Sequence, residues 1–274
     1  MSEPTRQPRP IAIFDSGIGG LPYLEAARAR LGTESFVYLG DRAGFPYGSK
    51  SREEVRDRVL GIVDSLVSAF GPKALVIACN TASQAGLEAA REAHPGLPII
   101  GTVPAVKPAV ERSRSGVVGL IGSAGCVEDP YLDALVARYA KGVEVVREGA
   151  QALVFFVERR AAVALEAERR EAVAPFVKPL IARGVDEIVL ACTHFLHVGG
   201  AIAAEAGPGV GVIDSREGVV RRLVQVLAER GLLAAGTRIG GKDRFVLTGQ
   251  APFEEEYFLL AEAFGLSGPE PLPG

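Results

Sequence analysis

The chain lacks the features of a membrane or disulfide-bonded protein. Among 274 residues it has no tryptophan, one methionine and three cysteines, Cys79, Cys126 and Cys192. Three widely spaced cysteines are too few for a disulfide framework or for paired CxxC zinc ligands. No apolar run reaches the roughly 20 residues that cross a bilayer, and the first ten residues have no apolar signal core. We therefore expect free thiols, no membrane contact and a cytoplasmic location.

A strong charge of either sign is also missing. The sequence has 30 Lys and Arg against 33 Asp and Glu, which gives a formal net charge of −3. No long basic run offers the phosphate-binding surface that nucleic-acid recognition needs, so nucleic acid is an unexpected ligand. Hydrophobic residues at 48% and charged residues at 23% are ordinary for a globular chain, which excludes a disordered one.

Short apolar runs alternate with helical patterns along the chain. This alternation is typical of parallel strands joined by crossover helices, and it predicts an α/β fold. The expected strands are residues 11–14, 35–39, 74–78, 98–101, 117–121, 143–146, 187–191 and 210–213. The expected helices include residues 55–70, 160–170, 216–230 and 253–264. The Gly- and Pro-rich end, residues 266–274, is predicted to be loose.

The sequence also repeats itself. Residues 75–79 read LVIAC and residues 188–192 read IVLAC, and polar residues follow both runs. A weaker echo relates residues 11–20 to residues 117–126. We therefore predict two similar βα-repeat domains with mainly parallel sheets facing a shared cleft. The first would be discontinuous, residues 1–101 and 212–274, and the second would be residues 102–211. Functional groups gather at the carboxyl ends of parallel strands, where all four motifs lie.

Cys79 and Cys192 are the leading candidates for chemistry because each ends an apolar strand. A single buried cysteine is readily explained as a small hydrophobic residue, but packing does not require a thiol at two equivalent strand ends. Such a pair suits either a disulfide switch or proton transfer from two sides. A free thiol with a pKa of about 8.5 is little ionised at neutral pH, so it needs help. The candidate helpers are the helix N-termini that follow, His194, Asp15, Asp41 and Glu158.

Two other patterns are less specific. Zinc binding by Cys79, Cys192 and His194 would lack the usual second close pair of ligands, so no metal is expected. The segment DSGIGG at residues 15–20 could hold a phosphate or a carboxylate at a helix start. It matches neither nucleotide-binding glycine motif, and a glycine turn before Pro22 explains it equally well.

Taken together, the motifs resemble those of the glutamate racemase family. They are DSGIGGL at 15–21, YLGDRAGFPYG at 38–48, ACNTAS at 78–83, GTVPAVKPA at 101–109, ACTHF at 191–195 and LTGQ at 247–250. The match runs from about residue 11 to residue 265, and the order and spacing of the motifs are more specific than any one of them.

The resemblance implies a cofactor-independent enzyme that interconverts L- and D-glutamate and supplies D-glutamate for peptidoglycan. Cys79 would take the α-proton from D-glutamate and Cys192 from L-glutamate, in a two-base mechanism. The supporting catalytic residues would be Asp15, Asp41, Glu158 and His194. The substrate-binding positions would be Asp15, Ser16, Tyr47, Gly48, Asn80, Thr81, Ser123, Thr193 and His194. The family fold is two α/β domains with the active site between them, usually in a homodimer.

Three departures from the family pattern keep other readings open. The GTxGT loop is Gly122-Ser123-Ala124-Gly125-Cys126 here, Leu196 replaces a proline, and Ala150-Gln151 replaces Cys-Pro. The alternatives are a racemase of aspartate or another acidic amino acid, a non-catalytic racemase-derived binding protein such as a DNA gyrase modulator, and a thiol redox protein.

Overall fold

The fold is built on two parallel sheets. The computed structural model describes residues 9–236 and 241–273. The first sheet has the strand order β10-β9-β2-β1-β3-β4 and the second has the order β6-β5-β7-β8, with every pairing parallel. The first sheet consists of β1 (Ile11–Asp15), β2 (Phe36–Gly40), β3 (Ala74–Ile77), β4 (Ile99–Gly101), β9 (Arg244–Leu247) and β10 (Glu270–Pro271). The second consists of β5 (Val117–Gly122), β6 (Glu144–Gly149), β7 (Glu187–Leu190) and β8 (Gly211–Ile213).

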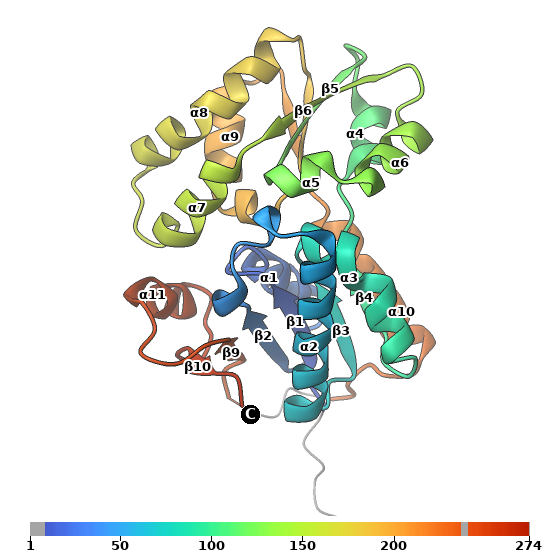
Figure 1. Cartoon of the computed structure of the whole chain (residues 1–274), viewed down its shortest axis with the longest axis vertical. Coiled ribbons are helices and arrows are strands. Elements are labelled where there is room, and N and C mark those ends of the chain that lie inside the picture. Colours follow the sequence, from blue (N-terminus) through green and yellow to red (C-terminus); the bar gives the residue numbers. More distant parts are fainter. Residues whose placement is uncertain (1–8, 237–240, 274) are drawn as a thin grey trace, which may run out of the picture.

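Helices surround each sheet, and the two halves stack along the long axis (Figure 1). The lower half has α1 (Leu21–Arg30), α2 (Arg52–Phe70), α3 (Asn80–Ala93), α10 (Arg216–Glu229) and α11 (Glu255–Ala263). The upper half has α4 (Val106–Arg112), α5 (Ala124–Glu128), α6 (Pro130–Tyr139), α7 (Gln151–Arg160), α8 (Glu166–Ala182) and α9 (Gly199–Ala206). Short 3-10 turns, η1 (Arg42–Gly44), η2 (Tyr47–Ser49) and η3 (Thr193–Val198), lie near the junction. The predicted α/β class with two parallel sheets is confirmed.

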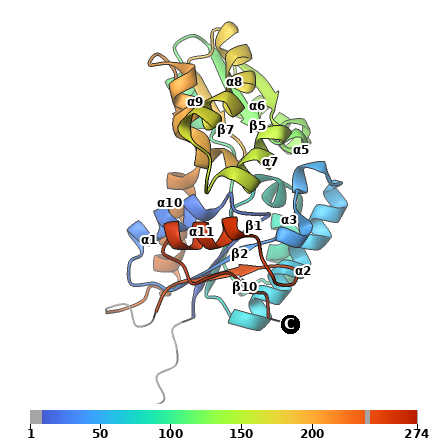
Figure 2. The same ribbon diagram turned by 90° about the vertical axis from the view of Figure 1, so that its left-hand side faces the viewer.

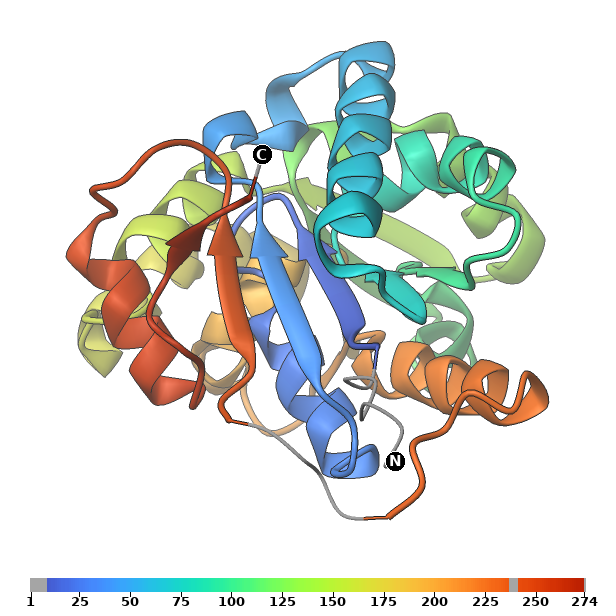
Figure 3. The ribbon, with the colours of Figure 1, turned by 90° about the horizontal axis from the view of Figure 1, so that it is seen from below.

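Residues 11–14 of the central strand β1 are all apolar, and the packing on its two faces explains why. Ile11 and Ile13 pack in one core cluster, with residues of α1 and α10, whereas Ala12 and Phe14 pack in another, with residues of α2 and α3. Successive side chains of a strand point to opposite faces, and both faces of this sheet carry helices (Figure 3). A strand buried on both faces therefore has no polar alternation.

Helix α2 covers one face and carries clear end signals. Ser51 caps its start in a reciprocal capping box with Glu54, and Gly71 ends it in the left-handed region at φ 50°. A residue in that region is usually glycine, because a Cβ is strained there. The helix predicted at residues 55–70 is confirmed.

Two local predictions were wrong. The helix expected at residues 160–170 is interrupted at residues 161–165: α7 ends at Arg160 and α8 begins at Glu166, because the Glu168 side chain accepts from the Leu165 amide and starts a new helix there. The tail is not loose: Glu270 and Pro271 pair with β9, and the Leu272 amide donates to the Leu247 carbonyl at 2.9 Å. An edge strand tolerates proline, and β9, its neighbour, was not predicted at all.

The chain crosses between the halves twice. It leaves the first sheet after β4, forms the second sheet from β5 to β8, and returns through Asp214 and Ser215 to α10. On this basis we propose the discontinuous division expected above, although β8 continues two residues past position 211. No helix in residues 9–236 and 241–273 combines the length and the apolar character that crossing a membrane requires.

Candidate active site

Cys79 lies at the carboxyl end of β3, where it caps α3. Its Sγ accepts from the Ala82 amide at 3.4 Å and donates to Ser16 Oγ at 3.4 Å. Burial raises the pKa of this thiol, and the nearby Asp15 carboxylate raises it further. Cys79 is therefore held as the protonated thiol in this state.

Cys192 occupies the corresponding place at the end of β7, in the other half of the molecule. Its Sγ lies 3.8 Å from His194 Nδ1. The opposite ring nitrogen, His194 Nε2, lies 2.8 Å from Glu158 Oε2. Burial lowers the pKa of His194, but contacts with Cys192 and Glu158 outweigh it and raise that pKa well above its ordinary value. These contacts favour the protonated form of His194, which lies between the Cys192 sulfur and the Glu158 carboxylate.

Both thiols line one small cavity between the halves. Its volume is about 20 Å³, which is room for roughly one water molecule. The cavity is lined by Ser16, Phe45, Pro46, Tyr47, Gly48, Cys79, Asn80, Thr81, Ser123, Val154, Ala191, Cys192, Thr193 and His194. All of the binding positions named from the sequence except Asp15 are in this lining. Phe45, Pro46, Val154 and Ala191 were not predicted as site residues. Phe45, Pro46 and Ala191 lie within motifs quoted above, whereas Val154 carried no sequence signal.

The three predicted carboxylates lie behind the lining rather than in it. Asp15 Oδ2 accepts from Thr193 Oγ1 at 2.9 Å, which joins β1 to the other half. Burial raises the pKa of Asp15, although the His194 charge opposes that shift. Glu158, on α7, reaches the cavity through His194. Each carboxylate therefore holds a residue that faces the cavity.

Asp41 supports the tyrosine side of the cavity. It accepts from Tyr47 Oη at 2.6 Å and from Arg58 Nη2 at 2.7 Å. Thr248, from the LTGQ motif, also donates to it. Asp41 therefore acts on the cavity through Tyr47. Arg58 was missed by the sequence analysis, because its contact is with a residue of another element and α2 gives no local sign of it.

Glycines let the halves approach closely. A Cβ on Gly17 would stand 2.4 Å from Glu158 Oε2, and one on Gly19 would stand 2.5 Å from Thr193 Oγ1. The DSGIGG segment thus serves to admit side chains of the second half.

The third thiol, that of Cys126, is separate from the pair that lines the cavity. Cys126 lies outside the cavity, where its Sγ donates to the Ala191 carbonyl at 3.3 Å and accepts from Gln84 Nε2 at 3.6 Å. Burial raises its pKa to about 12. All three cysteines are free. In the part of the chain that the structure describes, no three His, Cys, Asp or Glu side chains are grouped to hold a metal ion.

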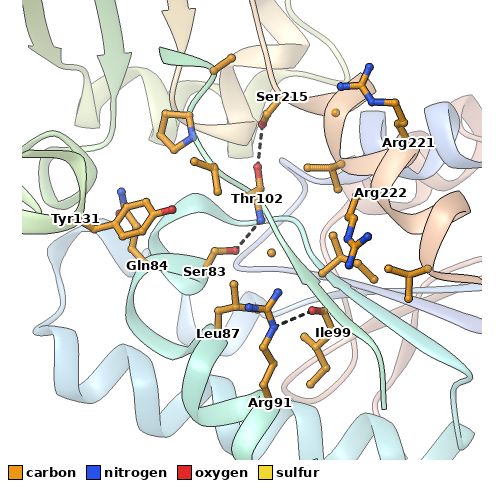
Figure 4. A pocket seen from close by; sticks show the side chains of 18 of the residues that line it. Ser83, Gln84, Leu87, Arg91, Ile99, Thr102, Tyr131, Ser215, Arg221 and Arg222 are labelled. Atoms are coloured by element: carbon orange, nitrogen blue, oxygen red, sulfur yellow. Dashed lines mark hydrogen bonds between the residues drawn. The ribbon is translucent and has the colours of Figure 1, made fainter. Parts of the chain in front are cut away.

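A much larger cavity, of about 1260 Å³, lies beside the connections between the halves (Figure 4). Thr102 and Ser215, one on each connection, share a hydrogen bond of 2.8 Å, and Tyr23 Oη bonds to both. Arg91, Arg221 and Arg222 also line it, but no thiol does. The small cavity with its paired thiols is therefore the candidate active site.

Comparison with known proteins defines the class. The family model described as Asp/Glu/hydantoin racemase matches residues 23–223. The chain belongs to this family, and it is an amino-acid racemase.

Relatives that cover most of the chain are named glutamate racemases. The glutamate racemase of Sphingopyxis alaskensis is 44% identical over 226 residues, which cover 79% of this chain and 81% of that protein. The Escherichia coli glutamate racemase, solved with L-glutamate and the activator UDP-MurNAc-ala, matches with a TM-score of 0.85 and 29% identity over 97% of this chain and 98% of that one. Glutamate racemase isoform RacE1 of Bacillus anthracis matches with a TM-score of 0.83 and 30% identity, covering 98% of each chain.

Proposed function

We propose that the protein interconverts L- and D-glutamate without a cofactor, by proton transfer between two thiols. The observation that carries this proposal is that Cys79 and Cys192, from opposite halves, line the same small cavity. Racemisation needs a base on one face of the Cα and an acid on the other. The relatives named glutamate racemase at 44% and 42% identity support the choice of substrate.

The two thiols have different surroundings. Burial and Asp15 raise the pKa of the Cys79 thiol, whereas the Cys192 sulfur lies 3.8 Å from His194 Nδ1. Cys192 as the thiolate would remove the α-proton of L-glutamate, and the Cys79 thiol would deliver a proton to the opposite face. The reverse reaction would begin with Cys79 as the base. Asp15 is placed to help on the Cys79 side, Glu158 works through His194, and Asp41 fixes Tyr47.

The carbanion intermediate requires a polar and water-free site. Hydroxyl groups of Ser16, Thr81, Ser123 and Thr193 line the cavity, and Thr81 Oγ1 lies 3.3 Å from Ser123 Oγ. Asn80 Oδ1 is buried and has no hydrogen-bond partner among the described residues, so it is an acceptor for the substrate's α-ammonium. Such groups stabilise developing charge best where water is excluded.

Glutamate is several times larger than the present cavity, so the closed state shown here would have to open for the substrate to enter. The connections at Thr102 and Ser215 are the place for such a hinge, because the chain crosses there twice. We also propose that the enzyme acts in the cytoplasm as a homodimer and that its product serves peptidoglycan synthesis.

The test is racemisation of purified L- and D-glutamate, followed by circular dichroism without added cofactor. Cys79→Ala and Cys192→Ala should each lose activity by at least about a thousandfold, since each removes one of the two proton-transfer groups. Cys126→Ala is the matched control, because it removes a buried thiol outside the cavity and should retain most activity. Full activity in either active-site variant would refute the two-thiol mechanism, and turnover of aspartate in preference to glutamate would refute the substrate.

A further inference from the structure

The carboxylate of Glu158 is held by three donors from separate parts of the chain. Oε2 lies 2.8 Å from His194 Nε2 and accepts from the Ile18 amide at 3.0 Å, whereas Oε1 accepts from Tyr257 Oη at 2.9 Å. The first two partners belong to motifs already described. Tyr257 does not: it lies on α11, near the end of the chain, and no motif pointed to it.

Helix α11 is fixed so that Tyr257 reaches this carboxylate. Glu254, at the start of the helix, makes a two-pronged ion pair with Arg42, with both N–O distances 2.8 Å. The Tyr257 ring contacts Phe245 of β9 edge to face, with 6.3 Å between centroids. The next two residues, Phe258 and Leu259, are exposed. Only the face of α11 that carries Tyr257 is thus directed inward.

The Tyr257 hydrogen bond also joins the two halves. Glu158 is on α7 in the upper half, and α11 lies below it in the lower half (Figure 2). Both side chains are 7% exposed. A hydrogen bond to a charged group is stronger than one between neutral groups, so this bond holds the carboxylate in position.

We propose that Tyr257 is a positioning residue of the racemase. Its hydrogen bond holds the Glu158 carboxylate against His194, and His194 in turn supports proton transfer by Cys192. This inference rests on the proposed function. Without the phenol, Oε1 loses its donor and the carboxylate is free to turn away from His194. Cys192 would then exchange protons more slowly, while the groups around Cys79 would keep their contacts.

The one-sided effect can be measured by isotope substitution. The equilibrium constant of a racemisation is one, so a slower enzyme must lose kcat/KM equally for both enantiomers. The isotope effects need not change equally, because Cys192 breaks the C–H bond of L-glutamate and Cys79 that of D-glutamate. Tyr257→Phe should lower kcat/KM about tenfold. It should raise the deuterium isotope effect on kcat/KM with α-deuterated L-glutamate and reduce it with the D-enantiomer.

The pH profile gives a second readout. Titratable groups that face Glu158 are Asp15 on β1, Tyr38 on β2, His194 and His197 on η3, and Tyr257 on α11. Burial raises the pKa of the Tyr257 phenol far above neutrality, so Tyr257→Phe removes a hydrogen bond and no charge. His194 would lose part of the support that raises its pKa, and the alkaline limb of kcat/KM should move to lower pH.

Tyr23→Phe is the matched control. It removes another buried phenol hydroxyl, one that bonds to Thr102 and Ser215 rather than to Glu158. It should leave the ratio of the two isotope effects and the alkaline limb unchanged. If Tyr257→Phe behaves in the same way while the two cysteine variants are inactive, this inference is wrong and the proposed function stands. Active cysteine variants would instead overturn the proposed function.

Discussion

Gly17→Ala should damage the active site by steric contact with one carboxylate. Gly17 comes two residues after the end of β1. Because it has no side chain, it leaves room for the carboxyl group of Glu158. An added Cβ would lie 2.4 Å from Oε2, 2.8 Å from Cδ and 2.9 Å from Oε1 of Glu158. All three are atoms of the same carboxyl group, so this group must move away as a unit.

The size of the effect follows from what Glu158 would lose. To reach ordinary van der Waals contact the carboxyl group must retreat by roughly 1 Å. Such a shift breaks or bends the bonds to His194 Nε2 at 2.8 Å and to the Ile18 amide at 3.0 Å. One lost hydrogen bond to a charged group costs about 1.5–3 kcal/mol. If this free energy is lost from the transition state, kcat falls about 10- to 100-fold.

The assay is racemisation of L-glutamate by circular dichroism, together with urea unfolding of each variant. Gly61→Ala is the control: Gly61 lies in the exposed part of α2, and a Cβ there meets nothing within 4 Å. That substitution should stabilise the protein by about 0.5–1 kcal/mol and leave kcat unchanged. If Gly17→Ala were as active as Gly61→Ala, Glu158 would not need its present position and the account of His194 would fail.

The regular parts of the fold followed from the sequence because their signals are local. The strand at residues 74–78 and the helix at residues 55–70 are set by apolar periodicity and by end signals such as Ser51 and Gly71. The repeated Ala-Cys ending gave the two parallel sheets, since both runs end buried strands. These features need no knowledge of distant residues.

The two failures have different causes, one a distant partner and the other a local helix-capping contact. The tail at residues 270–271 is ordered only by pairing with β9, and a single sequence gives no sign of that partner. The break after Arg160 depends on a capping contact by Glu168, which an apparently continuous helical pattern conceals. A tertiary contact therefore ordered the tail, whereas a local cap divided the helix.

The same distinction applies to the candidate site. The side chains at strand ends, Cys79 and Cys192 among them, were predicted to meet because functional groups gather at the carboxyl ends of parallel strands and the two domains were expected to face a shared cleft. The residues behind the lining were harder to find from the chain itself. Arg58 and Tyr257 reach Asp41 and Glu158 across 17 and 99 positions, and on their own helices they look like an ordinary surface arginine and core aromatic.

Two further predictions concern stability. Both amide atoms of Gln151 are buried without a hydrogen-bond partner among the described residues, so Gln151→Leu should stabilise the protein by about 1–3 kcal/mol in urea unfolding at pH 7; an unchanged or lower value would show that the amide is satisfied. Burial lowers the pKa of His197 from 6.5 to about 4, against a hydrogen bond to the Ile18 carbonyl that raises it. A histidine with a lowered folded-state pKa stabilises the protein above pH 6.5 and loses that contribution as the pH falls towards 4, because the unfolded chain takes up the proton first. His197 should contribute about 3 kcal/mol to this loss, so His197→Gln, which cannot titrate, should lose correspondingly less stability than the wild type over the same interval; equal losses would show that His197 is not the group responsible.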